Sequence, residues 1–315
     1  MSMPELLPDP AVVSHWLQAR RGHTTATVTA IEQLEGGASN ITCRIKISGG
    51  PWPEAVLRLQ RLHGIFEPYD VLREGRVLEA LAGTAVPVPR VLGREAEPSV
   101  LGAPFLLLEY IDAPHMGVAG REASYEAFAA MVATVHQVNW AAGAFAFLGV
   151  PHSPTAALHA ELDVVQARLR KFVGDTEPLL IASEQRLRAA VPKDGHLALC
   201  QGDINVFNYL FRAGRVAAVV DWEQARISDL RSDIGQLIAL SNLKGAPFAP
   251  ADAAPFARAY MAAGGEALAN LAWFRARWLW ELGVIYHGWV TFNGSSPWYS
   301  WEHLVELLQL ALVEL

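Results

Sequence analysis

The stretch that decides the fold is residues 197–223, LALCQGDINVFNYLFRAGRVAAVVDWE. It begins with a short apolar run and continues into a polar loop. Two further apolar runs follow, at 209–211 and 216–220, and they predict a β-hairpin. Gly214 and Arg215 between them suit a two-residue turn with glycine at its first central position. The sequence therefore predicts a hairpin that is entered through a polar loop.

Three polar residues are expected to meet at the open end of this hairpin. In the register that the turn implies, Asn208 lies opposite Asp221. A carboxamide and a carboxylate held side by side supply oxygen ligands of the kind that Mg²⁺ accepts. A second carboxylate, Asp203, lies five residues before Asn208 on the entering loop. The arrangement offers two metal ligands and a nearby base.

The order Asp, four residues, Asn, and an Asp thirteen residues later is the pattern of kinase-type phosphoryl transfer. The wording QGDINVFNYLF followed by VVDWE resembles the aminoglycoside phosphotransferase (APH-like) family of small-molecule kinases. The resemblance implies that Asp203 is the catalytic base, that Asn208 and Asp221 hold Mg²⁺, and that ATP donates its γ-phosphate to a hydroxyl of a small molecule. The alternative is an ordinary acidic hairpin with Asp and Asn in its loops.

Composition bounds the function classes. The 315 residues are 52% apolar and 18% charged, which provides for packed cores and excludes disorder. The formal charge of −7 without a basic block argues against nucleic acid and anionic membranes as partners, and leaves room for a cationic substrate.

Cys43 and Cys200 lie in predicted strands and suit a reducing compartment. No apolar run approaches membrane-spanning length and residues 1–10 do not resemble a signal peptide, so a cytoplasmic protein is expected. The sequence does not indicate an oligomeric state.

A glycine pair joins two predicted strands near the N-terminus, at 27–34 and 41–47. Glycines let the backbone approach a ligand, and successive N–H groups can cradle phosphate oxygens. The linking residues resemble the nucleotide-covering loop of the family, which implies contacts to ATP from Gly36, Gly37, Ser39 and Asn40. A simple tight turn is the alternative.

A predicted strand at 54–59 carries Arg58, and a helix capped by Asp70 is expected to run to about residue 82. Glu74 falls on the apolar face of this helix, where an unpaired carboxylate would be costly. Arg58 is its natural partner. The pair matches the strand cation and helix glutamate of kinases, which implies that both help to bind nucleotide. Alternatives are that both side chains are solvated, or that Lys46 serves as the cation.

The apolar segment 105–111 reads as a buried strand, and its exit stands where the family joins its two lobes. The resemblance implies that the Glu109 carbonyl and the Ile111 N–H bind the adenine edge. It places a nucleotide-binding lobe at 1–111 and a helical lobe with the catalytic loop and substrate site at 112–315. The expected fold is α+β: a two-lobed, protein-kinase-like molecule with ATP and Mg²⁺ in the cleft. The small lobe is a five-stranded antiparallel sheet with one helix.

Several residues of the second lobe keep two interpretations. His136 is expected to be structural rather than catalytic, and Glu223 is a candidate to face substrate. Asp233, at the start of an apolar helix, either complements the helix dipole or ties the catalytic loop to that helix. Trp273 and Trp280 lie on one helix face, either as core or as the wall of a pocket for a cationic acceptor.

The sequence departs from the wider pattern at two positions. Arg58 stands where kinases carry lysine, and Gln201 stands where the family usually has histidine before Gly-Asp. Both departures support a rival hypothesis, a non-catalytic nucleotide-binding pseudokinase or scaffold. The acceptor remains open between choline, sugar and antibiotic types. The sequence around Arg58 and around Pro87-Val88-Pro89 most resembles the subgroup related to acyl-CoA dehydrogenase-associated phosphotransferase domains.

Overall fold

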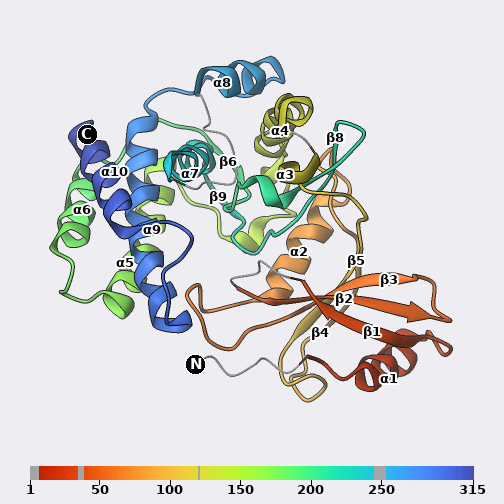
Figure 1. The fold of residues 1–315 in the computed structure, drawn as a ribbon. Coiled ribbons are helices and arrows are strands. Elements are labelled where there is room, and N and C mark those ends of the chain that lie inside the picture. Colours follow the sequence, from red (N-terminus) through yellow and green to blue (C-terminus); the bar gives the residue numbers. More distant parts are fainter. Residues whose placement is uncertain (1–6, 35–38, 120, 245–252) are drawn as a thin grey trace. The chain divides into compact units, whose positions relative to one another are not determined.

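The computed structural model describes residues 7–34, 39–119, 121–244 and 253–315. The chain divides into two compact units. The N-terminal unit comprises Met1–Gly83 and Pro87–Asp112, and the C-terminal unit comprises Thr84–Val86 and Ala113–Leu315 (Figure 1).

The N-terminal unit is built on one antiparallel sheet with the strand order β1-β2-β3-β5-β4. Every second residue of β2 is buried, as period-2 alternation requires of a strand with one face on a core. The predicted five-stranded antiparallel sheet is therefore confirmed. Its elements are α1 (Pro10–Arg21), β1 (Thr27–Gln33), β2 (Ile41–Ser48), β3 (Glu54–Leu59), α2 (Val71–Leu81), β4 (Val91–Glu95) and β5 (Phe105–Glu109).

Helix α1 covers part of this sheet. Asp9 caps its N-terminus by accepting a hydrogen bond from the Ala11 N–H at 2.8 Å, and Gly22 ends it in the left-handed conformation at φ 72°. The ring of Trp16 packs edge-on against Phe105 of β5, with 4.9 Å between the ring centroids. These contacts place the core of the unit between the sheet and α1.

Helix α2 begins as predicted. The Asp70 carboxylate accepts a hydrogen bond from the Arg73 N–H at 2.9 Å, and Ala82 follows the last helical residue. Gly75 lies so close to Leu106 of β5 that a larger side chain would collide with it. The close packing holds one face of α2 on the sheet.

The C-terminal unit is mostly helical, and its small strands form two separate pairs, β6 with β9 and β7 with β8. The longer elements are α3 (Met116–Ala119), α4 (Arg121–His136), α5 (Pro154–Phe172), α6 (Pro178–Ala189), β6 (Leu197–Cys200), β7 (Tyr209–Arg212), β8 (Arg215–Val219), β9 (Arg226–Asp229), α7 (Arg231–Asn242), α8 (Ala253–Ala262), α9 (Leu271–Asn293) and α10 (Trp301–Val313). Short 3₁₀ turns lie at Trp140–Ala142, Ala146–Leu148 and Val206–Asn208.

The aromatic stripe of α9 belongs to the core of this unit. Trp273 is 4% exposed and Trp280 is fully buried, within a cluster drawn from α5, α6, α7, α9 and α10. Each indole N–H donates to a backbone carbonyl of α6, at Leu187 and Leu180 respectively. The core interpretation is confirmed for both tryptophans, because neither side chain is accessible to an acceptor.

Cys43 and Cys200 are both buried free thiols. Among the residues that the structure describes, no helix combines the length and hydropathy needed to cross a membrane.

Candidate active site

The β7–β8 hairpin forms, but its turn differs from the sequence prediction. Arg212 pairs with Arg215, so the central residues are Ala213 and Gly214 rather than Gly214 and Arg215. Both have positive φ, 50° and 75°, as in the type I′ turns whose twist matches that of the strands. The predicted turn was therefore wrong by one residue.

The pairing of Asn208 changes in consequence. The register shifts between Leu210 and Phe211, which oppose Ala218 and Val216 respectively. The Val220 N–H then donates to the Asn208 carbonyl at 2.9 Å. Asn208 therefore lies opposite Val220, and the predicted pairing with Asp221 was wrong. The reason is the turn, which lies one residue earlier than predicted and would by itself put Asn208 opposite Val219; the register shift at Leu210 then moves the partner to Val220.

Asp221 follows directly after this pair and has a positive φ of 61°. Asp tolerates this left-handed conformation better than most residues, but it still costs free energy and persists only where the surrounding fold imposes it. The negative charge of Asp221 acts on Asp203, whose pKa it helps to raise. The two carboxylates are therefore electrostatic neighbours.

Helix α7 anchors the polar loop between β6 and β7 through hydrogen bonds to its backbone. The Asp233 carboxylate accepts hydrogen bonds from the backbone N–H groups of Gln201 at 2.9 Å and Gly202 at 3.1 Å. Strand β6 also pairs with β9, which closes the base of the segment 201–225. Asp233 thus connects the loop to α7, as one of the two sequence interpretations predicts.

His136 extends this connection to two further helices. Its Nε2 lies 3.3 Å from the Asp233 carboxylate, and its Nδ1 lies 2.8 Å from the Tyr260 hydroxyl of α8. The imidazole is buried with both of these partners. The predicted structural role of His136 is confirmed.

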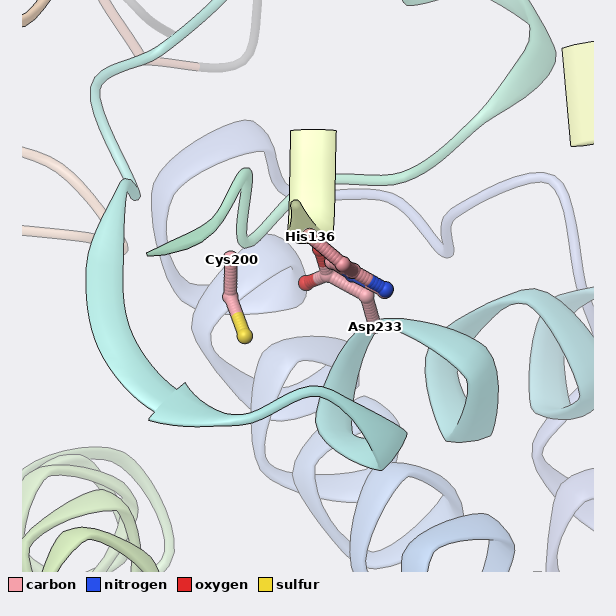
Figure 2. Close-up of side chains that lie close together, drawn as sticks. All are labelled: His136, Cys200 and Asp233. Carbon is pink, nitrogen blue, oxygen red and sulfur yellow. The ribbon is translucent and has the colours of Figure 1, made fainter. Parts of the chain in front are cut away.

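Figure 2 shows His136 alongside Asp233, with Cys200 of β6 to one side. Their ligand atoms lie within 4.8 Å of one another, a spacing that a metal ion could bridge. Burial, however, raises the pKa of the Cys200 thiol well above its usual range, and Sγ lies 3.5 Å from the Asp229 carbonyl. The hydrogen bonds of His136 and Asp233 with each other and of Asp233 with the loop make the cluster a hydrogen-bonded junction between the loop, α4 and α7.

Asp203 is held by three side-chain amides. Its Oδ2 accepts hydrogen bonds from Nδ2 of Asn205 and Nδ2 of Asn208, each at 2.9 Å. Its Oδ1 accepts one from Nε2 of Gln236, also at 2.9 Å. Desolvation and the charge of Asp221 raise the pKa of Asp203 to about 6, against the lowering effect of the three amides. A carboxylate with this pKa is suited to take up a proton near neutral pH.

Asn208 is oriented by the same hydrogen bonds. Its Nδ2 donates to both the carbonyl and the carboxylate of Asp203, each at 2.9 Å. The amide oxygen Oδ1 is consequently the atom that Asn208 offers to a cation. Together with the carboxylate of Asp221, it makes a set of hard oxygen donors, which fits Mg²⁺.

Asn205 and Gln236 were missed from the sequence. Asn205 caps the following 3₁₀ turn by accepting from the Phe207 N–H at 2.9 Å. Gln236 lies three residues after Asp233, on the same face of α7, and is 5% exposed. A polar side chain on that buried face requires a partner, and this was the available signal.

Gln201, at the position where the resemblance implies a histidine, anchors the loop through its side chain. The Gln201 side-chain Nε2 donates a hydrogen bond to the Val220 carbonyl at 2.8 Å, and Gln201 is fully buried. The contact ties the start of the loop to the end of the hairpin, next to Asp221.

The residues that the sequence predicts to bind nucleotide lie in the N-terminal unit. Arg58 on β3 and Glu74 on α2 form the predicted ion pair. Ser39 and Asn40 are buried, and Asn40 Oδ1 accepts from the Arg61 N–H at 3.3 Å. Gly36 and Gly37 lie outside the described residues. The predicted roles of the backbone at Glu109 and Ile111 stay predictions.

The chain is similar to several known phosphotransferases. The model of the family described as "Phosphotransferase enzyme family" (APH) matches residues 30–279. Among solved structures, a putative aminoglycoside phosphotransferase from Ralstonia eutropha has a TM-score of 0.69 at 21% identity, covering 98% of this chain and 96% of that one. A macrolide 2'-phosphotransferase type I has a TM-score of 0.61 at 22% identity, covering 98% and 99%. These likenesses confirm the kinase-like fold.

The curated relatives carry another name. Acyl-CoA dehydrogenase family member 10 of Mus musculus is 27% identical over 224 residues, which cover 67% of this chain and 20% of that protein. A probable acyl-CoA dehydrogenase of Arabidopsis thaliana, IBR3, is 24% identical over 228 residues, covering 65% and 27%. The chain thus spans about a fifth to a quarter of the length of these relatives. Because the family model matches most of the sequence, from residue 30 to residue 279, the chain belongs to the APH family of phosphotransferase enzymes.

Proposed function

We propose that this enzyme transfers the γ-phosphate of ATP to a hydroxyl of a small molecule, with Asp203 as the catalytic base. The observation that carries the proposal is the hydrogen-bonded cage of Asp203, in which three amides fix the carboxylate while its pKa stands at about 6. A fixed carboxylate can orient the attacking hydroxyl and accept its proton. Because phosphoryl transfer depends chiefly on positioning and charge neutralisation, a rigid base is what the reaction requires.

Asn208 and Asp221 would hold Mg²⁺ through the amide oxygen and the carboxylate. A bound Mg²⁺ supplies neutralisation of the charge on the phosphate oxygens. The strained backbone of Asp221 supports this assignment, since positive-φ conformations of non-glycine residues concentrate at functional positions. Asn208 contributes in a second way, because its amide also holds Asp203 in place.

The N-terminal unit would bind the nucleotide. Arg58, oriented by Glu74, would contact the phosphates, with the loop at Gly36, Gly37, Ser39 and Asn40 covering them and the backbone of Glu109 and Ile111 reading the base. A structural relative, a thermostable mutant of aminoglycoside phosphotransferase APH(4)-Ia in a ternary complex with ADP and hygromycin B, supports nucleotide binding. Another relative, aminoglycoside 2'-phosphotransferase-IIIa, was solved as a GDP complex, so GTP belongs in the test as a second donor.

The acceptor is a small molecule with a free hydroxyl. Structural relatives are named for aminoglycosides and macrolides, and curated relatives for acyl-CoA dehydrogenases. An acceptor panel should accordingly contain aminoglycosides, macrolides, sugars, choline and hydroxylated acyl thioesters. The net charge of −7 favours cationic members of the panel in the encounter with the enzyme.

The test combines nucleotide binding with turnover. Thermal unfolding of the wild-type chain is measured with ATP or GTP, with and without Mg²⁺, beside the variant Asp221→Asn. Phosphoryl transfer to the acceptor panel is measured beside Asp203→Ala. We expect Mg²⁺-dependent stabilisation that Asp221→Asn removes, and turnover that Asp203→Ala reduces by about 10²-fold or more. Full turnover by Asp203→Ala would contradict the base assignment.

The rival function is nucleotide binding without catalysis. The presence of Arg58 and Gln201 at positions where kinases usually carry Lys and His favours it. That hypothesis predicts stabilisation by nucleotide that is indifferent to Mg²⁺, with no transfer to any acceptor. The same two experiments therefore separate the two functions.

A further inference from the structure

Gln236 of α7 uses both ends of its side-chain amide on the loop that carries Asp203. Its Nε2 donates to Asp203 Oδ1 at 2.9 Å, and its Oε1 accepts from the Ile204 N–H, also at 2.9 Å. The residue is 5% exposed. Since a backbone N–H can only donate, the amide oxygen must face Ile204, and the NH₂ group must face Asp203. The orientation of the amide is thereby fixed.

The two oxygens of Asp203 are unequally engaged. Within the described part of the chain, Oδ2 accepts two hydrogen bonds, from Asn205 and Asn208, whereas Oδ1 accepts one, from Gln236. A carboxylate oxygen has about two acceptor positions. Oδ1 is consequently the oxygen that retains an acceptor position for a hydroxyl group.

Gln236 and Asp233 also act from the same helix. Asp233 holds the backbone N–H groups of Gln201 and Gly202, and one turn later Gln236 holds the Asp203 side chain. One face of α7 therefore fixes both the loop backbone and the carboxylate. This second contact is what distinguishes Gln236 from a purely structural support.

We propose that Gln236 is a positioning residue of the transfer reaction, which orients the Asp203 carboxylate so that Oδ1 receives the proton of the acceptor hydroxyl. The inference rests on the proposed function, in which Asp203 is the base. In the reaction, the hydroxyl oxygen bonds to the γ-phosphorus of ATP, the bond from that phosphorus to the β–γ bridging oxygen breaks, ADP leaves, and the hydroxyl proton passes to Oδ1. Gln236 acts on the reaction through its hydrogen bond to Asp203.

A pair of substitutions separates positioning from support. Gln236→Glu keeps an oxygen for the Ile204 N–H but removes the donor to Asp203 and places a carboxylate against it. Gln236→Met removes both hydrogen bonds at similar side-chain volume. Gln166→Met is the matched control, because Gln166 also lies on a helix and donates from Nε2, but to Glu184 and not to the loop.

The rates are measured as ATP consumption with the best acceptor of the panel and, independently of any acceptor, with water. We expect both Gln236 variants to lose about 10- to 100-fold in kcat, the range of one hydrogen bond to a charged group, with the KM for ATP unchanged and Gln166→Met at the wild-type rate. A wild-type kcat in Gln236→Glu, in spite of the carboxylate placed against Asp203, or a wild-type kcat in Gln236→Met would show that the contact between Gln236 and Asp203 is dispensable for turnover. That result overturns the inference.

Asp203→Asn, assayed in parallel, distinguishes failure of the inference from failure of the proposed function. An inactive Asp203→Asn with a fully active Gln236→Glu overturns the positioning role and leaves Asp203 as base. An active Asp203→Asn, or a wild-type chain that consumes no ATP, overturns the proposed function and the inference with it. A crystal structure of Gln236→Met that shows the Asp203 carboxylate turned away from its wild-type orientation supports positioning.

Discussion

Arg58 of β3 and Glu74 of α2 form a buried ion pair, with 3.0 Å between Nη1 and Oε1 and only 6% and 1% of the two residues exposed. A buried carboxylate is tolerated when a cation and hydrogen bonds compensate its desolvation, and removing one partner leaves the other charge less compensated. The pair fixes the position of the Arg58 guanidinium relative to α2.

Substituting Glu74 should therefore destabilise the chain. We expect Glu74→Ala to lower the free energy of unfolding by about 3 kcal/mol, measured by urea denaturation. Glu79→Ala is the matched control, because Glu79 lies on the same helix and pairs with Arg94 at 3.0 Å with both side chains about half exposed. Equal losses in the free energy of unfolding for the two substitutions would show that burial does not determine how much the Arg58–Glu74 pair contributes to stability.

Glu161 of α5 predicts how stability depends on pH. Burial by itself would raise the pKa of Glu161, but Arg226 and Arg277, with the hydroxyl of Ser228, lower it from 4.5 to about 2. Its Oε1 lies 3.0 Å from Arg226 Nε, and its Oε2 lies 3.1 Å from Arg277 Nη2. The folded state therefore holds this carboxylate ionised more strongly than the unfolded state does.

A lowered pKa gives stability that is complete above pH 4.5 and is lost as the pH falls towards 2, because the unfolded state takes up the proton first. We expect a loss of about 3 kcal/mol from Glu161 over this range. Chemical denaturation at a series of pH values measures it. Glu161→Gln should be less stable at neutral pH, and its free energy of unfolding should fall less steeply as the pH is lowered from 4.5 towards 2. An unchanged pH dependence would refute the assignment.

Gly202 permits the tight approach of the loop that carries Asp203 to its neighbours. Its φ is 83°, and a Cβ there would overlap the carbonyl oxygen of Gln224 and the guanidinium of Arg226. We expect Gly202→Ala to cost about 3 kcal/mol from backbone strain and steric overlap, and to abolish turnover. Gly83→Ala is the control, because no atom lies within 4 Å of the added methyl group. Thermal unfolding of the two variants makes the comparison.

Ala213 offers a stabilising substitution. It occupies the first central position of the β7–β8 turn at φ 50°, where asparagine is favoured before glycine. We expect Ala213→Asn to raise the free energy of unfolding by about 0.5–1 kcal/mol and Ala213→Val to lower it, since a β-branched residue is strained at positive φ. Two shifts of the same sign would be inconsistent with a left-handed Ala213.

Local pattern predicted most of the elements and some of their contacts. Helix α2 starts after Asp70 because capping is a property of adjacent residues. The partner of Glu74 was predictable because helical periodicity put a carboxylate on a buried face next to a strand with one suitable cation. The kinase-type spacing of Asp203, Asn208 and Asp221 was readable in the same way, as an ordered set of residue types.

What the tertiary structure decided were contacts between distant segments. The position of the turn and the register shift at Leu210 together put Asn208 opposite Val220, and sequence symmetry does not indicate the shift. Gln236 meets Asp203 across 33 residues because α7 packs beneath the loop. Trp273 is core rather than pocket wall because helices on several sides cover it. Short-range periodicity fixes which residues share a face, whereas the packing of remote segments fixes what that face meets, and only the folded chain contains the second kind of information.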